Sequence, residues 1–339
     1  MSIRILWAGP SSTVQDRGRF GYRRFGVPTA GAADEHAYRL ANLLVGNAEN
    51  AAAVESTLAG PTIAFLEDCA VCLTGAEFTP SLNGKRIEMY RAFLCRAGDV
   101  LEMGAATVGC RGYIAVLGGI DVPVVMGSRS TYVRAALGGH EGHALRDGNT
   151  LPVGRHRDLP RGISLRCTAL PLREDNPVLR VVLGPQDDYF APEGIDAFFA
   201  SAYKVRVESD RMGVRLSGAP ITHLGDGNII SDGVSAGAIQ VPGDGLPIVL
   251  LADAQTTGGY PKIAHVATVD LSRLAQLRPG DGVRFAPIPV DEAQALYLER
   301  LRAYEALVQR LDAISARARD FEVKIAGTAY RISVGPAEP

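Results

Sequence analysis

The chain has 339 residues, of which 47% are hydrophobic and 21% are charged, and its formal net charge is −2. This length and balance are typical of a globular protein with room for two domains, and the net charge gives no sign of a nucleic-acid-binding protein. No apolar run reaches the roughly 18 residues of a membrane span, and the N-terminus enters a strand-like pattern without a signal-peptide core, so we expect a cytoplasmic protein.

Short apolar runs bordered by Gly, Pro, Asn or Asp predict strands along most of the chain. They are Arg4–Trp7, Thr62–Leu66, Ala70–Leu73, Tyr113–Leu117, Leu179–Leu183 and Pro247–Ala252. Helical periodicity predicts three helices, at Asp34–Val45, at Gly194–Tyr203 and from Asp291 to about Arg317. The last carries an apolar stripe formed by Tyr297, Leu301, Tyr304, Val308 and Leu311. This stripe suits packing against the protein's own barrel, which we favour, or against a partner helix.

An internal sequence repeat predicts that a β-rich domain is duplicated. "RILWAGP" at residue 4 resembles "RVVLGP" at residue 180, and Asp16-Arg17-Gly18 has a counterpart at residues 210–213. Residues 60–76 align loosely with 237–254, and "RAGDVLEM" at residue 96 parallels "RPGDGVRF" at residue 278. Chance similarity between Gly- and Pro-rich strands explains four ordered matches less well. We expect subdomains at 1–165 and 178–288, a helix at 290–318 and a hairpin-like tail at 320–339.

Cysteine and histidine offer only weak metal-site signals. Cys69 and Cys72 form a C-x-x-C pair, but they lie in a strand-like run, where residues three apart face opposite sides of the sheet. His140 and His143 have a passable ligand spacing without an accompanying cluster, which favours solvated loop histidines. We therefore predict no metal site.

Two Gly-punctuated loops carry arginines that suit an anion. Residues 15–24 contain four arginines, and Arg17 either clamps a carboxylate substrate or pairs locally with Asp16. Residues 127–132 place Arg129 and Ser130 in a turn whose backbone N–H groups are able to form an anion nest. We predict that Arg17, Arg129 and Ser130 bind substrate.

A polar cluster at residues 253–262 follows the apolar strand that ends at Ala252. Such a position allows side chains to converge on a pocket. Lys262 is one of four lysines among 35 basic residues, and a self-capping turn does not explain Lys262 together with Gln255. We take Asp253 and Lys262 as candidates for proton transfer. The predicted substrate-binding residues of this half are Gln240, Gln255, Thr256, Thr257 and Tyr260.

Long motifs in both halves carry a family resemblance. "TVQDRGRFGYRRFGVPTAGAAD", "GSRSTYVRAALGG", "SDRMGVRLSG" and residues 231–285 together resemble the biotin-dependent carboxyltransferase family, also called allophanate hydrolase subunit 2 or the KipA type. The resemblance covers about residues 3–285. It implies a mainly β fold (α+β) with two cyclophilin-like β-barrel subdomains. At His140 and His143 the chain departs from the aromatic residue and the arginine that are usual in the family.

The resemblance also implies a function. The family includes the C subunit of ATP-dependent 5-oxoprolinase, which opens 5-oxo-L-proline to L-glutamate together with a KipI-type B subunit and a lactam-hydrolase A subunit. ATP with Mg²⁺ is expected in that complex. Two alternatives are the carboxyltransferase part of a biotin-dependent urea or amide carboxylase, and a KipA-type regulator that antagonises a histidine-kinase inhibitor. The chain lacks an Ala-Met-Lys-Met motif, so we expect no biotin on it.

We further predict that Arg17, Arg129, Gln255 and Lys262 share one cleft. A small anionic amide needs a carboxylate clamp, which arginine supplies, and donors aimed at its carbonyl oxygen, which Gln255, Thr256 or backbone N–H groups supply.

Overall fold

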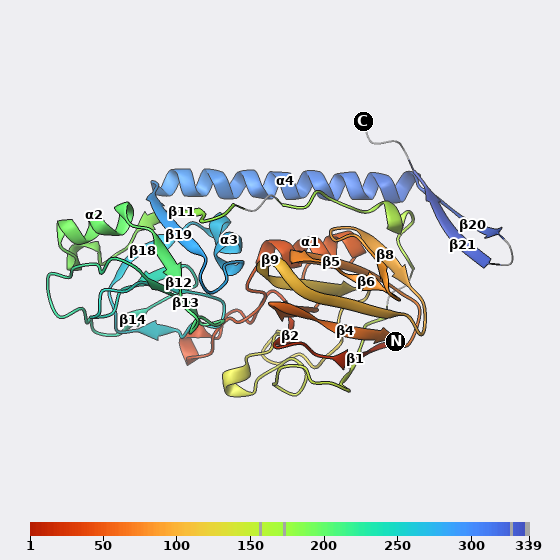
Figure 1. Ribbon diagram of the computed structural model, residues 1–339, viewed down its shortest axis with the longest axis horizontal. Helices are drawn as coiled ribbons and strands as arrows, with labels where there is room; N and C mark the ends of the chain where they lie inside the picture. Colours follow the sequence, from red (N-terminus) through yellow and green to blue (C-terminus); the bar gives the residue numbers. More distant parts are fainter. Residues whose placement is uncertain (156–157, 172–173, 326–327, 336–339) are drawn as a thin grey trace. The chain divides into compact units, whose positions relative to one another are not determined.

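The computed structural model describes residues 1–155, 158–171, 174–325 and 328–335. Strands dominate and helices are few, as predicted (Figure 1). Two compact units are present. Unit 1 comprises Met1–Arg17, His36–Pro171 and Leu301–Pro339, and unit 2 comprises Gly18–Glu35 and Leu172–Arg300. The sequence placed the segment from Gly18 to Glu35 in the first subdomain. The domain boundaries expected from the sequence stay a prediction.

Unit 1 is built on a ten-stranded sheet whose pairings are antiparallel. Its main path runs through β10 (Thr150–Pro152), β1 (Ser2–Trp7), β4 (Ala59–Phe65), β3 (Ala53–Thr57), β9 (Val100–Val116), β5 (Cys69–Phe78) and β8 (Ala92–Cys95). Strand β2 (Ser12–Gln15) pairs with β3, while β6 (Ser81–Leu82) joins β9 and the short β7 (Lys85–Arg86).

Strand β5 is buried on both faces. Cys69, Val71 and Leu73 enter the hydrophobic core of the unit. On the other face the hydroxyl group of Thr74 donates to the carbonyl of Ala37 in helix α1 (Glu35–Val45) at 2.7 Å. Cys72 shares the face of Thr74 because side chains alternate along a strand, and burial raises the pKa of its thiol. The two cysteines of the C-x-x-C pair thus lie on opposite faces, as predicted.

Unit 2 contains a closed barrel. Its strands follow the order β11 (Val178–Leu183), β18 (Lys262–Val266), β15 (Ala238–Gln240), β16 (Ile248–Leu250), β13 (Gly213–Ser217), β12 (Tyr203–Val205) and β19 (Gly282–Pro287). The parallel pairing of β19 with β11 closes the ring. Helix α2 (Pro192–Ala200) seals the core by stacking Phe198 on Phe285, with ring centroids 4.8 Å apart. Helix α3 (Leu271–Ala275) adds Leu274 to the same core.

The two units repeat one turn with the same geometry. The Asp99 carboxylate accepts from the backbone N–H of Arg96 at 2.7 Å, and Asp281 accepts from that of Arg278 at 2.8 Å. The intervening Gly98 and Gly280 have φ angles of 92° and 93°, a conformation that favours glycine. This supports the duplication predicted from "RAGD" and "RPGD".

Hydrogen bonds to the same turn show which strands of the two units correspond, and this correspondence differs from the predicted alignment. The backbone N–H of Phe65 donates to Asp99 O, and that of Val205 donates to Asp281 O, both at 2.9 Å. Strand β4 therefore corresponds to β12, and the match of residues 60–76 with 237–254 is wrong. Buried strands bordered by glycine look alike in sequence, so they give an alignment little information.

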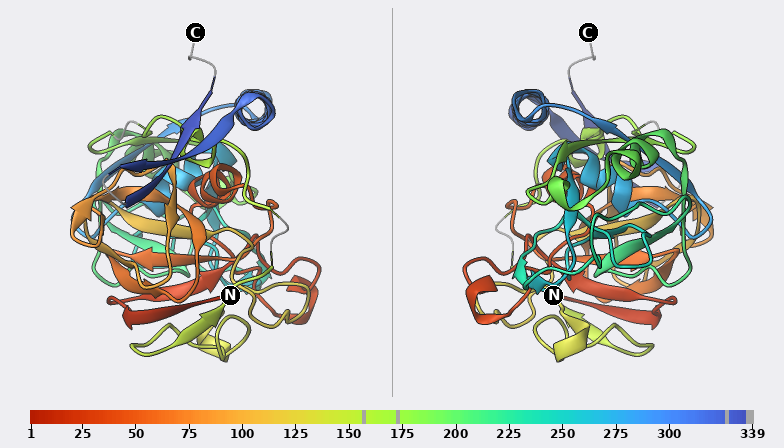
Figure 2. Two further views of the ribbon diagram at one scale, coloured as in Figure 1. Left: turned by 90° about the vertical axis from the view of Figure 1, so that its right-hand side faces the viewer. Right: turned by 90° about the vertical axis from the view of Figure 1, so that its left-hand side faces the viewer.

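Helix α4 (Val290–Arg317) continues into the antiparallel hairpin of β20 (Arg319–Ile325) and β21 (Thr328–Val334), which Figure 1 labels at the end of the helix, and Figure 2 shows α4 end-on. From Leu301 onward the apolar stripe packs within unit 1. There Tyr304 lies under the guanidinium group of Arg39, 4.2 Å from the ring centroid, and Leu311 is fully buried. This confirms packing against the protein's own fold for that part of the helix. No helix in the described part of the chain is long and apolar enough to cross a membrane.

Candidate functional site

Lys262 lies at the start of β18 with its side chain only 7% exposed. Its ammonium group donates to Asp232 Oδ2 at 2.5 Å and to the carbonyl oxygen of Gly233 at 2.9 Å. The Asp232 side chain is 56% exposed. The pair therefore joins a buried cation to a carboxylate that faces solvent. The ammonium group of Lys262 therefore lies near the surface but is only partly hydrated.

Asp232 is positioned by neighbouring strands and by Gln186. The two-residue strand β14 (Asp232–Gly233) pairs with β17 (Thr257–Gly258). Gln186 Nε2 donates to Asp232 Oδ2 at 3.3 Å, and Gln186 Oε1 accepts from the backbone N–H of Lys262 at 3.2 Å. The hydrogen bond from Lys262 is the main reason that the pKa of Asp232 lies below its ordinary value, with a further contribution from the Gly233 N–H.

Gln240 and Gln255 form an amide pair next to this ion pair. Gln240 faces Lys262 across the β15–β18 ladder, and its Oε1 accepts from Gln255 Nε2 at 3.4 Å. Gln240 Nε2 in turn donates to the carbonyl oxygen of Tyr260 at 3.2 Å. A Cβ atom at Gly258 would lie 2.4 Å from Gln240 Nε2, so a side chain there would displace the amide. The structure thus brings together Gln240, Gln255, Tyr260 and Lys262, all of which the sequence singled out.

Asp253 forms a bidentate ion pair with Arg211. Arg211 Nε and Nη2 each donate to one carboxylate oxygen of Asp253 at 2.9 Å, and Nη2 also donates to Gly31 O at 2.6 Å. The backbone N–H of Ala30 donates to Ala252 O at 3.1 Å. This network fastens the segment from Gly18 to Glu35 onto the barrel of unit 2, beside the residues that precede Gln255.

Arg23, in the segment that Asp253 helps to fasten, reaches the same loop. Its Nη2 donates to the carbonyl oxygen of Val234 and, at 3.4 Å, to that of Gln255. Burial lowers the pKa of Arg23. Thr256 is half-buried and Thr257 is exposed. The carbonyl of Thr256 accepts from the backbone N–H of Val234 at 3.1 Å.

In unit 1, the predicted anion nest holds a carboxylate of the same chain. The hydroxyl groups of Ser128 and Ser130 donate to Asp16 Oδ1 at 2.6 and 2.5 Å, and the backbone N–H of Arg129 donates to Asp16 Oδ2 at 2.6 Å. The donors expected for an external anion are therefore occupied by Asp16. The guanidinium group of Arg129 binds Asp121 Oδ1 at 2.8 Å and the carbonyl of Val122 at 2.9 Å.

Arg17 follows Asp16 but points elsewhere. Its Nη1 lies 3.4 Å from Glu49 Oε2, and its side chain is 40% exposed. Arg17 and Arg129 belong to unit 1, whereas Gln255 and Lys262 belong to unit 2. The cleft predicted to contain all four stays a prediction. Within the described ranges, no three His, Cys, Asp or Glu side chains are placed to hold a metal ion, and this holds for the loop of His140 and His143.

The sequence did not predict Asp232, Gln186 or Arg211 as site residues. Asp232 is 30 residues before Lys262, and Gln186 is 76 residues before it. Gln186 follows β11, which pairs with β18, and Asp232 belongs to β14, which pairs with β17, so both contacts depend on strand pairings between segments that are far apart in the sequence. One available signal was "SDG" at residue 231, where a small acidic turn precedes a run of apolar residues.

Comparison with known proteins agrees with the fold and with the motifs. The family description "Carboxyltransferase domain, subdomain A and B" matches residues 25–287. The chain is 39% identical to the C subunit of 5-oxoprolinase from Escherichia coli over 91% of this chain and 98% of that one. It is 38% identical to the protein of that name from Haemophilus influenzae, over 88% and 97%.

A solved structure shows the same architecture inside a larger enzyme. The crystal structure of the Kluyveromyces lactis urea amidolyase superimposes with a TM-score of 0.83 at 32% identity, covering 90% of this chain and 20% of that one. The match to the 5-oxoprolinase C subunits, by contrast, spans nearly the whole of both chains. From its fold and its sequence, the chain belongs to the family of carboxyltransferase domains, subdomains A and B.

Proposed function

We propose that the chain is one component of an ATP-hydrolysing 5-oxoprolinase complex, which opens 5-oxo-L-proline to L-glutamate. The observation that carries this proposal is the 38–39% identity to 5-oxoprolinase C subunits over about nine-tenths of this chain and nearly all of each relative. The cluster of Gln240, Gln255, Asp232 and Lys262 offers matching chemistry.

The reaction adds water across the C–N bond of a lactam. Amide resonance makes that bond stable, so opening it needs energy, which ATP hydrolysis supplies in the complex, and stabilisation of the negative charge that develops on the carbonyl oxygen. A buried ammonium group and neutral amide N–H donors stabilise such charge well. In our proposal Lys262 and Gln255 point these donors at the lactam oxygen or at a phosphoryl group, while Gln240 orients Gln255.

The other predicted residues take supporting roles in this proposal. Arg17 binds the substrate carboxylate, since its guanidinium group is partly exposed. Asp253 acts through Arg211, because both of its oxygens accept from that guanidinium group. Arg129 and Ser130 shape the loop around Asp16. Thr256, Thr257 and Tyr260 line the approach to Gln255.

The proposal includes two partner proteins. The chain acts with a KipI-type protein and a lactam-hydrolase protein, and ATP with Mg²⁺ belongs to the complex. No biotin is attached to this chain.

One alternative has specific support. The superposition on the urea amidolyase of Kluyveromyces lactis favours a carboxyltransferase part of a biotin-dependent urea or amide carboxylase. The two enzymes differ in what they require. A 5-oxoprolinase releases glutamate with ATP alone, whereas a carboxylase needs bicarbonate and a biotinylated carrier.

The test is to purify the chain together with its KipI-type and lactam-hydrolase partners and to measure glutamate released from 5-oxo-L-proline. We expect release that depends on ATP and stops when this chain is omitted. Activity that appears only when bicarbonate and a biotinylated carrier are added would reject the proposal in favour of the carboxylase.

A further inference from the structure

The apolar side chains of α4 are more exposed in the first turns of the helix than in the later ones. Beyond Leu301, Tyr304, Leu311 and Ile314 are at most 9% exposed. In the part that belongs to unit 2, Val290, Tyr297 and Leu298 are 52%, 41% and 50% exposed. These residues recur at helical spacing and therefore form one face. This face is thus only partly covered.

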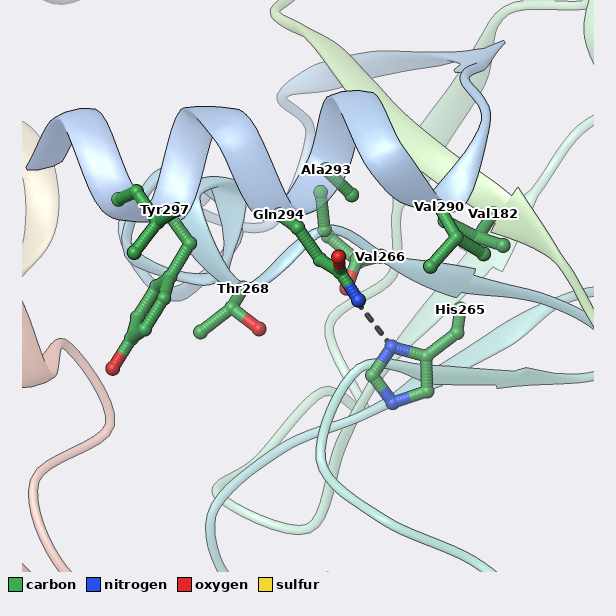
Figure 3. Close-up of a pocket in the computed structure, with 10 residues that line it drawn as sticks. Val182, His265, Val266, Thr268, Val290, Ala293, Gln294 and Tyr297 are labelled. Atoms are coloured by element: carbon green, nitrogen blue, oxygen red, sulfur yellow. Dashed lines mark hydrogen bonds between the residues drawn. The ribbon is translucent and has the colours of Figure 1, made fainter.

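A cleft of about 420 Å³ lies under this face, within unit 2 (Figure 3). Its apolar wall includes Val182 of β11, Val266 of β18, and Val290, Ala293 and Leu298 of α4. Its volume falls within the range of small-molecule sites. Lys262 is not part of the lining, since it lies at the opposite end of β18. The cleft is therefore separate from the cluster around Lys262.

Polar groups are few and are concentrated along one side. Figure 3 shows the amide of Gln294 and the ring of His265 pointing toward one another, with Thr268 between Gln294 and Tyr297. His265 Nδ1 lies 2.9 Å from Val266 O, and Nε2 lies 3.0 Å from Ser235 Oγ. Burial lowers the pKa of His265 and so favours the neutral form of the ring.

The lining contains no Asp, Glu, Lys or Arg among the residues that the structure describes. A charged ligand would lose part of its hydration against this apolar wall without gaining a counter-charge, which is unfavourable. The amide of Gln294, by contrast, both donates and accepts hydrogen bonds, as a ligand amide does. We propose that the cleft binds an uncharged small molecule with an apolar body and one carboxamide-type group, held by Gln294.

The test compares two probes that differ in charge and hardly in shape. The full chain is titrated with cyclohexanecarboxamide and with cyclohexanecarboxylate while its amide NMR signals are recorded. We expect the carboxamide to shift signals of α4 and β18 with a dissociation constant of about 10 mM or tighter, which is ordinary efficiency for a probe of this size. The carboxylate should bind at least about tenfold more weakly.

Variants locate the site. Ala293→Trp fills the cleft and should abolish carboxamide binding, whereas Ala295→Trp, a matched change at an exposed position outside the lining, should leave it intact. Gln294→Met keeps the side-chain volume and removes the amide, so it should weaken carboxamide binding several-fold even if Ala293→Trp perturbs the fold. Equal binding of both probes, no binding of the carboxamide, or binding unaffected by Gln294→Met would overturn the proposal. None of these outcomes bears on 5-oxoprolinase activity.

Discussion

Lys262 and Asp232 meet at 2.5 Å although the first is buried and the second faces solvent. The pair places a cation at the start of β18, beside the amides of Gln240 and Gln255. Because Lys262 is buried and paired, the effect of replacing it can be compared with the effect of replacing an exposed lysine.

Replacing Lys262 with Met should reduce ATP-dependent glutamate release by the complex about 100-fold or more. The variant keeps the aliphatic side chain but removes the charge that would stabilise the lactam oxygen. Lys204→Met is the matched control, since Lys204 is an exposed lysine on β12 of the same barrel. If both variants retain full activity, Lys262 is only a structural residue.

The amide pair should show energetic coupling. Gln255→Leu and Gln240→Leu each break the hydrogen bond between the two side chains, so their effects on kcat/KM should be less than additive, with a coupling of about 0.5–3 kcal/mol. A double-mutant cycle in the reconstituted complex measures it. Binding of the two partner proteins, measured by co-purification, should stay unchanged.

The same variants examine the regulatory hypothesis of a KipA-type protein. A protein that acts only by binding a kinase inhibitor would not need Gln255 or Lys262. A kinase effect that survives both substitutions, together with no lactam-opening activity in the wild-type complex, would favour regulation.

Lys262 should also control the titration of Asp232. Because the hydrogen bond from Lys262 holds the pKa of Asp232 below its ordinary value, the ion pair is complete above that ordinary value and is lost as the pH falls through the folded-state pKa. In Lys262→Met the pKa of Asp232 should rise. Carboxyl ¹³C NMR titration measures it, and Lys204→Met should leave it unchanged.

Removing Arg180 should destabilise unit 2. Asp270 is fully buried and accepts from Arg180 Nη2 at 2.6 Å and from Arg180 Nε at 2.9 Å. Arg180→Met leaves a buried carboxylate without this partner, which costs about 3 kcal/mol. Urea denaturation measures the loss. Arg206→Met, which breaks an exposed pair with Glu208, should change the urea midpoint far less.

The cost of Arg180→Met should depend on pH. Burial alone would raise the pKa of Asp270, but hydrogen bonds from Arg180 lower it overall. The stabilisation is therefore present above the unfolded-state pKa of about 4 and is lost as the pH falls through the lower folded-state pKa. The gap between wild type and variant should narrow on acidification. A gap that widens below pH 4 would contradict this account.

Local features of the fold were predictable from the sequence. The apolar run at Leu179–Leu183 became β11, and the periodic segment from Asp291 became α4, because burial periodicity is encoded within each segment. The turn at Gly98 was recognisable from four residues. The partners of Lys262 were not, because Asp232 and Gln186 reach it only through the pairing of strands that are distant in the sequence.

The nest around Asp16 shows a second limit of prediction. Glycines and hydroxyl groups at residues 127–132 correctly indicated an anion-binding turn. They did not reveal that the anion is Asp16 of the same chain, more than a hundred residues away in sequence. A pattern of donors identifies the charge of a ligand but not its source.

The most direct test of the central claim is glutamate release from 5-oxo-L-proline by the chain combined with its KipI-type and lactam-hydrolase partners, in bicarbonate-free buffer without a biotinylated carrier. The account predicts ATP-dependent release that is lost when this chain is omitted and is reduced about 100-fold by Lys262→Met. Release that proceeds equally without this chain, or that begins only when bicarbonate and a biotinylated carrier are supplied, would contradict it.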